Sequence, residues 1–383
     1  MTSSLGVAWR QLSHQPAKLL AASAGVVVAV MLMLVQLGIR EGAISSGVAF
    51  SHRLDADLVV VSLATETIFR SGQFPRRLLY RLPSDPAVAA ISEVYMGQAQ
   101  WRNPWTGIQH PISVYGLSPR RTMVDLPGFA DVLELELADQ FVFDALSRTS
   151  YGPVVTSVAS DGPLFAEVNG RRIRVIDTVA VGVSFSVDGN LYGTPANFLR
   201  LLPSRDAGAI DLGLVRLVPG SNVEAARERL QELLGREARI LSRNQLIEEE
   251  IAFLRSNAPI DFIFGMGTVV GFFIGFVVVY QILYTEVTHH LPQLATLKAT
   301  GFTDGYLLKL VLWQALSLSC FGYLPGFALA VGVYQLAESQ IQMPMSMTPA
   351  RALGVWGATV IMCGFSAMVA VRRAWQADPA EVF

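Results

Sequence analysis

Four long stretches of this sequence contain no charged residue, and they constrain the fold more than any other feature. They lie between Lys18 and Arg40, Asp261 and Glu286, Lys309 and Glu338, and Arg351 and Arg372. The hydrocarbon core of a bilayer is about 30 Å thick, and about 20 apolar residues in an α-helix cross it. A charge at the centre of such a helix costs about 2.5–3.5 kcal/mol on insertion. The four runs therefore predict four transmembrane helices.

The composition agrees with a lipid environment. Hydrophobic residues make up 52% of the 383 residues and charged residues 16%, whereas an ordinary soluble domain has about 25% charged residues. The formal net charge of -2 provides no basic surface for nucleic acid, so we expect no nucleic-acid partner. Cys320 and Cys363 both lie in apolar runs, and we interpret them as small buried side chains rather than a redox or metal pair.

Two of the runs have further features. The run after Lys18 is longer than the 7–15-residue core of a signal peptide, so we interpret it as an uncleaved transmembrane helix. Before it, the apolar residues of segment 5–12 share one helical face, which predicts an amphipathic helix on the membrane surface; a frayed terminus is the alternative. In the third run, Gly322 and Pro325 predict a kink or a local break.

The basic residues near the helix ends predict the orientation. They precede the first helix, separate the second from the third, and follow the fourth: Arg10 and Lys18, Lys298 and Lys309, Arg372 and Arg373. Since basic loops stay in the cytoplasm, both termini are expected there. The loop 338–351 and the long segment between the first two helices are then outside. The four apolar helices are expected to contact the lipid bilayer, which is therefore one of the partners of this chain.

The segment between the first two helices, 41–259, is long enough for one or two folded units. It shows strand patterns at 55–62, 94–101, 212–218 and 238–241, and helix patterns at 74–82, from Ser84-Asp85-Pro86 onward, and at 223–234. The middle is β-rich, with hairpin signals at Asn169-Gly170 and Asp188-Gly189. From 244 to 257 a polar helix with three consecutive glutamates, 248–250, leads back to the membrane.

These patterns predict four transmembrane α-helices with a large α+β extracytoplasmic domain inserted between helices 1 and 2. Residues 1–40 contain the amphipathic segment and the first transmembrane helix. Residues 41–120 plus 206–260 form one α+β subdomain, into which a β-rich subdomain, 121–205, is inserted. Residues 261–383 contain the other three transmembrane helices and a cytoplasmic loop, 286–309.

Several kinds of chemistry are missing from the 383 residues. No G-x-x-x-x-G-K-[ST] phosphate-binding loop occurs, and neither a zinc-protease motif nor a G-x-S-x-G motif is present. His289 and His290 are adjacent, so on a helix they diverge by about 100° and cannot face one metal ion. The apolar runs contain only modest polar groups, among them Gln36, Gln281 and Gln314. An ion-coupled pump would place ionisable groups there, so we expect helices that pack and move rather than a hydrophilic path.

Two segments are candidate functional sites. In the second helix, Gly267, Gly271 and Gly275 recur every four residues, which predicts a face that another helix can approach closely; the alternative is the general abundance of glycine in membrane helices. In the loop 286–309, Pro292 can start a short helix and Gly301 can end it. Leu294, Leu297 and Lys298 are three to four residues apart and share one of its faces.

This loop carries a family resemblance. The segment from Glu286 to Thr303, EVTHHLPQLATLKATGFT, resembles the DevC family of ABC permeases, within the class that includes MacB, LolC and FtsX, in its acidic residue and its LKA-x-G ending. The preceding QILYT of 281–285, the terminal ADPAEVF of 377–383, and the regions 182–190 and Phe198 are also similar to that family.

The resemblance implies a function and its partners. It implies an ABC exporter permease in the bacterial inner membrane, acting as a homodimer with a separate ABC ATPase subunit that binds ATP and Mg, so that this chain binds no cofactor and is not an enzyme. The coupling to that ATPase would involve the following residues: Glu286, Leu291, Pro292, Leu294, Leu297, Lys298, Ala299, Gly301 and Phe302. The two outside subdomains would correspond to the family's porter and sabre parts.

On the outer side, the resemblance implies a periplasmic domain that engages a membrane-fusion protein and an outer-membrane channel. ATP-driven motion of the helices would make this domain expel a lipid-like or other periplasmic cargo. The alternative is an FtsX-like regulator, in which the same domain controls a periplasmic enzyme and transports nothing. A membrane-bound enzyme is the third possibility, but no catalytic constellation supports it.

Overall fold

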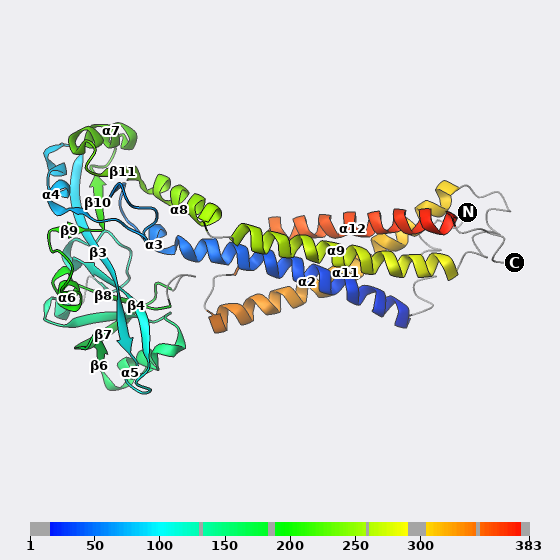
Figure 1. The fold of residues 1–383 in the computed structure, drawn as a ribbon, viewed down its shortest axis with the longest axis horizontal. Coiled ribbons are helices and arrows are strands. Elements are labelled where there is room, and N and C mark those ends of the chain that lie inside the picture. Colours follow the sequence, from blue (N-terminus) through cyan, green and yellow to red (C-terminus); the bar gives the residue numbers. More distant parts are fainter. Residues whose placement is uncertain are drawn as a thin grey trace. The chain divides into compact units, whose positions relative to one another are not determined.

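The structure is a computed structural model that describes residues 16–129, 133–182, 188–257, 260–289, 304–341 and 345–376. It consists of two compact units (Figure 1). The membrane unit comprises Met1–Gly42, Ile260–Gln340 and Met345–Phe383, and the sheet unit comprises Ala43–Pro259 with Ile341–Pro344. The predicted amphipathic segment 5–12 lies outside the described residues.

The membrane unit is built from long apolar helices: α2 (Pro16–Gly47), α9 (Ile260–His289), α11 (Asp304–Ile341) and α12 (Pro349–Gln376). Four parts of these helices are long and apolar enough to cross a membrane, namely Ser23–Gly47, Ile260–His289, Val311–Glu338 and Pro349–Arg372. The predicted transmembrane helices are therefore confirmed. The charged residues of these spans lie near their ends. Side chains such as Val30, Val279 and Met362 form a common core between the helices.

Helix α11 corrects one expectation. A kink or a local break was expected at Pro325, and α11 continues through it without interruption, so the break is wrong and the kink stays a prediction. A proline removes only one backbone N–H from the helical ladder, and neighbouring helices in a membrane protein can accommodate this. Here Gly322 and Gly326, on either side of Pro325, both lie against α2.

The sheet unit contains a nine-stranded sheet in the order β11-β1-β10-β3-β4-β8-β5-β7-β6 and a two-stranded sheet, β2-β9. Most pairs are antiparallel, but β4–β8 and β5–β7 are parallel. The strands are β1 (Leu58–Val61), β2 (Phe74–Pro75), β3 (Val88–Arg102), β4 (Gln109–Leu117), β5 (Gln140–Asp144), β6 (Leu164–Val168), β7 (Arg171–Val179), β8 (Asn190–Gly193), β9 (Ala209–Ile210), β10 (Leu212–Leu217) and β11 (Arg239–Ser242).

The long strand β3 joins the two halves of this sheet. Its first part pairs with β10, where Leu212 lies opposite Val94, and its last part pairs with β6, where Trp101 lies opposite Val168. This second pairing closes β3, β4, β8, β5, β7 and β6 into a ring. Trp101 and Val168 are fully buried inside it. The closing pairing covers the last two residues of β6, Glu167 and Val168.

The other half of the sheet, strands β11, β1 and β10, combines segments that are distant in sequence. Strand β1 lies between β10 and β11, with Leu58 opposite both Val215 and Ser242. The fold class predicted for the domain, α+β, is confirmed. The division at 120 and 206 stays a prediction, because one continuous sheet contains strands from both predicted subdomains and 43–259 forms one compact unit.

The helices of the sheet unit are short except for two. They are α3 (Ala49–His52), α4 (Arg76–Leu79), α5 (Val154–Asp161), α6 (Pro195–Leu201), α7 (Val223–Leu234) and α8 (Arg243–Asn257), with 3₁₀ turns at Leu82–Ser84, Pro119–Arg121, Leu133–Glu136 and Thr149–Tyr151. Helix α7 occupies the predicted range 223–234. Its N-cap is Asn222, whose side chain accepts from the Ala225 N–H at 3.1 Å, and Gly235 follows it at φ +60°.

Two local expectations need correction. The predicted helix start at Ser84-Asp85-Pro86 is wrong: Asp85 accepts from the Ala87 N–H at 2.8 Å, and β3 begins at Val88. The side chain of Asp85 therefore caps a turn rather than a helix. The hairpin at Asn169-Gly170 is confirmed, with φ values of 50° and 75° between β6 and β7. The first arm of the hairpin at Asp188-Gly189 lies outside the described residues.

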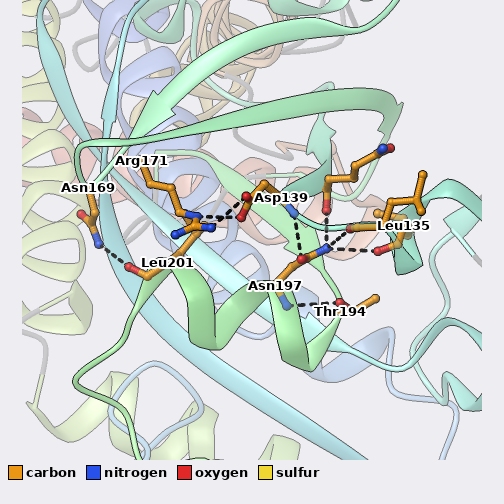
Figure 2. A network of polar contacts seen from close by, with 9 residues as sticks. Leu135, Asp139, Asn169, Arg171, Thr194, Asn197 and Leu201 are labelled. Carbon is orange, nitrogen blue, oxygen red and sulfur yellow. Dashed lines mark hydrogen bonds and ion pairs between the residues drawn. The ribbon is translucent and has the colours of Figure 1, made fainter.

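Asn197, in α6, fastens the closed half of the sheet unit together (Figure 2). Its side-chain amide donates to the carbonyl oxygens of Leu135, Leu137 and Gln140 at 3.1, 2.8 and 3.1 Å. Its side-chain oxygen accepts from the Asp139 N–H at 2.9 Å. One buried side chain thus satisfies backbone groups of a segment that forms few hydrogen bonds of its own.

The same segment is closed by an ion pair. The Arg171 guanidinium binds both carboxylate oxygens of Asp139, at 2.6 and 2.9 Å (Figure 2), and holds the pKa of Asp139 below its usual range. Asp139 has φ +62°, which is uncommon for a residue other than glycine. Its two partners, Arg171 and Asn197, hold it in that conformation.

Candidate functional site

The predicted coupling segment is described only at its start. Glu286 lies in the last turn of α9 and is half-buried. The remaining predicted coupling residues lie outside the described residues: Leu291, Pro292, Leu294, Leu297, Lys298, Ala299, Gly301 and Phe302. Their role in binding an ATPase stays a prediction.

The glycine face of α9 lies against α2 of the same chain. A Cβ at Gly267 would be 2.6 Å from the side-chain amide carbon of Gln36, and one at Gly271 would be 3.3 Å from Leu32 and Met33. At Gly275 a Cβ would be 2.7 Å from the Ala29 Cβ and 2.5 Å from the Met362 sulfur of α12. The space at this face is therefore occupied within one chain.

A second close contact joins α2 to α11, and sequence patterns did not indicate it. A Cβ at Gly326 would be 2.9 Å from both the Val27 carbonyl oxygen and the Val30 Cβ. Gly38 of α2 lies against the ring of Tyr334, which leaves no room for a side chain. Helix α2 therefore packs closely against both α9 and α11.

Polar groups connect the same helices. The Tyr334 hydroxyl donates to the Leu34 carbonyl oxygen, and the Arg351 guanidinium donates to the Tyr334 oxygen at 3.3 Å. Arg40 of α2 and Asp261 of α9 form an ion pair at 2.7 Å. In a low-dielectric environment such partners are strongly favoured over unpaired groups. The four helices thus form one connected bundle.

In the sheet unit, the chain segments that lead out of the first span and into the second are in contact. Gly47, the last residue of α2, lies so close to α8 that a Cβ would be 2.6 Å from Leu254. Arg243 of α8 donates to the His52 carbonyl oxygen at 2.7 Å. Ser51 of α3 donates to the carboxylate of Glu250. We call this contact the α3–α8 joint.

Glu250 is the centre of the joint. It is 2% exposed, and its second carboxylate oxygen accepts from the Ile68 N–H at 2.9 Å. The sequence predicts a polar helix at 244–257, which α8 confirms, and the last of its three consecutive glutamates, Glu250, is buried. The signal was available: Glu250 follows the buried Leu246 and Ile247 by four and three residues, so it shares their face of the helix.

A polar cavity of about 170 Å³ is lined in part by the loop whose Ile68 N–H binds Glu250. Residues 68–71 form one wall and strands β3 and β4 another. Asp211 binds Arg205 at 2.6 Å and accepts from the Met96 N–H at 2.8 Å and the Ser71 hydroxyl at 3.2 Å. Burial raises the pKa of Asp211, although these hydrogen bonds and Arg205 oppose the shift.

The described residues show no arrangement that could hold a metal ion: no group of three or more His, Cys, Asp or Glu side chains converges among them. A close-packed helix bundle is joined along the chain to a folded domain, whose entry and exit segments are fastened to each other.

Four membrane helices with a sheet domain inserted after the first define a permease-type membrane protein, and comparison with known proteins gives its family. The family described as MacB-like periplasmic core domain matches residues 19–233, and the family described as FtsX-like permease C-terminal matches residues 258–379. The chain belongs to the MacB/FtsX class of ABC permeases.

Solved structures are similar only in part. The periplasmic region of MacB from Actinobacillus actinomycetemcomitans matches at 14% identity and a TM-score of 0.36, over 51% of this chain and 94% of that one. The extracellular domain of the noncanonic ABC-type transporter YknZ from Gram-positive bacteria matches at 11% identity and a TM-score of 0.33, over 49% and 100%. No curated protein matches the chain. The four apolar helices and the MacB-like domain fit an inner-membrane protein with a periplasmic domain.

Proposed function

We propose that this chain is the permease subunit of an ATP-driven exporter, and that it works as a homodimer with a separate ATPase. One observation carries the proposal. The chain combines an FtsX-like permease region with a MacB-like periplasmic core domain, yet its 383 residues contain no phosphate-binding loop. Energy must therefore enter from a nucleotide site outside these residues, through a cytoplasmic contact.

The proposed mechanism is mechanical. The cytoplasmic loop 286–309 receives the motion of the ATPase, the close-packed helices transmit it, and the periplasmic domain expels cargo. The apolar character of the spans supports this, since they contain no row of ionisable groups for an ion or substrate path. The contacts of α2 with α9 and α11 support it too, because helices in van der Waals contact move together.

We further propose that the cargo is lipid-like or another periplasmic molecule, and that it leaves through a membrane-fusion protein and an outer-membrane channel. The size of the sheet unit supports export. Besides strands β11, β1 and β10, it contains a ring of six further strands, β3, β4, β8, β5, β7 and β6. The FtsX-like alternative assigns the same surface to a periplasmic enzyme. Co-purification with a fusion protein would support export, whereas a bound cell-wall hydrolase would support regulation.

The coupling role is tested with Leu297→Glu. On the proposed helix, Leu297 faces the ATPase or membrane, and a carboxylate there would have to be desolvated in an apolar contact. We expect normal membrane insertion, at least a ten-fold loss of ATPase co-purification and no stimulated ATP hydrolysis. The control is Glu338→Lys, a charge change at an exposed residue near the opposite end of α11, which should leave both measurements unchanged. Wild-type ATPase binding by Leu297→Glu would remove this loop as the coupling element.

A further inference from the structure

Glu250 combines two properties that are rarely found together. It is a carboxylate with 2% exposure, and it accepts hydrogen bonds from two neutral donors, the Ser51 hydroxyl and the Ile68 N–H. Among the residues that the structure describes, no lysine, arginine or histidine forms a salt bridge with it. A buried carboxylate is normally paired with a cation, because removing the charge from water is costly.

Three arginines on the surrounding elements bind other groups. Arg239 of β11 forms an ion pair with Glu249 of α8 at 3.2 Å. In the loop 62–73, Arg70 forms an ion pair with Glu66 at 3.7 Å. Arg243 of α8 donates to the backbone oxygen of His52 at 2.7 Å. The electrostatic environment of Glu250 is therefore set by its burial and its two hydrogen bonds. Burial raises the pKa of Glu250, while the bonds from Ser51 and Ile68 oppose this.

The position of Glu250 gives its charge a mechanical consequence. Ser51 belongs to α3, which follows the first membrane span, whereas Glu250 belongs to α8, which precedes the second. Ile68 belongs to the loop that forms a wall of the polar cavity next to Arg205 and Asp211. Separation of α3 from α8 would break the Ser51 hydrogen bond and expose Glu250 to water, and separation of the loop 62–73 from α8 would release the Ile68 N–H.

We propose that Glu250 is a proton-dependent latch: its neutral form holds α3 and the loop 62–73 against α8, and its ionised form loosens this joint. The neutral carboxylic acid still accepts from the Ile68 N–H and can donate its own proton to the Ser51 oxygen. The ionised form keeps both hydrogen bonds, but burial of its charge in the closed joint is unfavourable, because the charge is removed from water. The latch concerns the sheet unit alone and does not depend on the cargo or on the ATPase.

The sign of the pH effect follows from linkage. The closed joint raises the pKa of Glu250, and opening returns it towards its ordinary value of 4.5. The closed form then binds the proton more tightly, so acid favours closure. Between the pKa of Glu250 in the open joint and its raised pKa in the closed joint, the fraction of open joint should increase by up to about ten-fold per pH unit. Above the raised pKa it should level off.

Hydrogen–deuterium exchange of the full chain in detergent tests this. Exchange of peptides covering 44–52 and 62–73 is measured from pH 4.5 to pH 8 and corrected for the intrinsic pH dependence of amide exchange. In the wild type we expect corrected exchange to rise several-fold with pH and reach a plateau. Glu250→Gln can make the same two contacts without a titrating proton, so its corrected exchange should be low and independent of pH.

A second variant keeps the latch testable if Glu250→Gln fails to fold. Ser51→Ala removes a hydrogen bond that favours the ionised form, so the pKa of Glu250 in the closed joint should rise further; exchange should begin to rise at the same pH but reach its plateau at a higher pH. The control is Glu249→Gln at an exposed neighbour, which should retain the wild-type profile. Flat corrected exchange in the wild type, an unchanged profile in Ser51→Ala, or the same pH dependence in Glu250→Gln would each overturn the proposal.

Discussion

At the residue scale, two charged side chains have structural roles that were not predicted from the sequence. Arg351 follows the outer loop, where a basic residue opposes the usual charge bias of membrane proteins. In the structure it binds the Tyr334 hydroxyl at 3.3 Å and the Ser346 carbonyl oxygen at 2.9 Å. Glu250 is similarly committed to Ser51 and Ile68. Both side chains bind groups of other elements. Their charges therefore indicate neither the membrane orientation of the chain nor a surface exposed to water.

Asn197 should be among the most sensitive residues of the sheet unit. Asn197→Ala removes donors from three carbonyl oxygens and an acceptor from the Asp139 N–H (Figure 2). Since each lost neutral hydrogen bond costs about 1 kcal/mol, more where a buried group stays unsatisfied, we expect a loss of about 2–4 kcal/mol. Thermal unfolding of the full chain, followed by tryptophan fluorescence, measures this. Asn244→Ala, at an exposed position, should change the midpoint little; equal midpoints for both variants would contradict this role.

At the element scale, α2 packs closely against two other helices of the membrane unit. It contacts α9 at Gly267, Gly271 and Gly275, and α11 at Gly322 and Gly326. Close approach lets backbone and side-chain atoms of different helices make many weak contacts, which replace the hydrophobic driving force that lipid does not provide. A displacement of α2 must therefore be shared by its neighbours.

The glycine face gives a direct test of this packing. Gly275→Leu places a side chain where the Cβ alone would be 2.5 Å from the Met362 sulfur and 2.7 Å from the Ala29 Cβ. We expect a loss of about 1–3 kcal/mol from overpacking, measured as a lower melting temperature of the full chain in detergent. The matched control is Gly265→Leu on the same helix, where a Cβ meets no atom within 4 Å. Equal melting temperatures for the two variants would show that the close contact contributes nothing.

At the scale of the whole molecule, the two units differ in what stabilises them. The membrane unit buries a small core among helices whose outer surfaces remain apolar, for example at Phe262, Leu324 and Ile361. The sheet unit has a large core on both sides of its sheet, including Trp101 and Phe198 on one side and Tyr115 and Phe129 on the other. Only the sheet unit has the composition and core of a domain that is stable in water.

The sheet unit should therefore fold alone. A fragment of residues 43–259 contains all strands of the nine-stranded sheet and no cysteine, so its stability depends on the core and not on disulfides. We expect circular dichroism of a mixed α+β protein and one cooperative thermal transition. The far-UV spectrum and the melting curve of the purified fragment are the measurements. A disordered or aggregated fragment would mean that membrane helices or partners complete its core.

Much of the fold could be predicted because the signals are local. Charge-free runs identify the transmembrane helices, and Asn169-Gly170 identifies a hairpin through the positive φ that its turn requires. The helix expected from Ser84-Asp85-Pro86 failed because Asp85 can cap a turn as well as a helix. The break expected at Pro325 failed because a proline's effect depends on neighbouring helices.

The sequence by itself determined which segments meet lipid and which meet water, because solvation depends on the apolar or charged character of consecutive residues. It also determined the inserted α+β domain and the absence of a phosphate-binding loop from these residues. Only the tertiary structure decided that β1 lies between β10 and β11, that β6 closes a ring with β3, and that Glu250 is buried without a cation. These features depend on contacts between residues far apart in the chain, and no local pattern of charge or hydropathy specifies such a pairing.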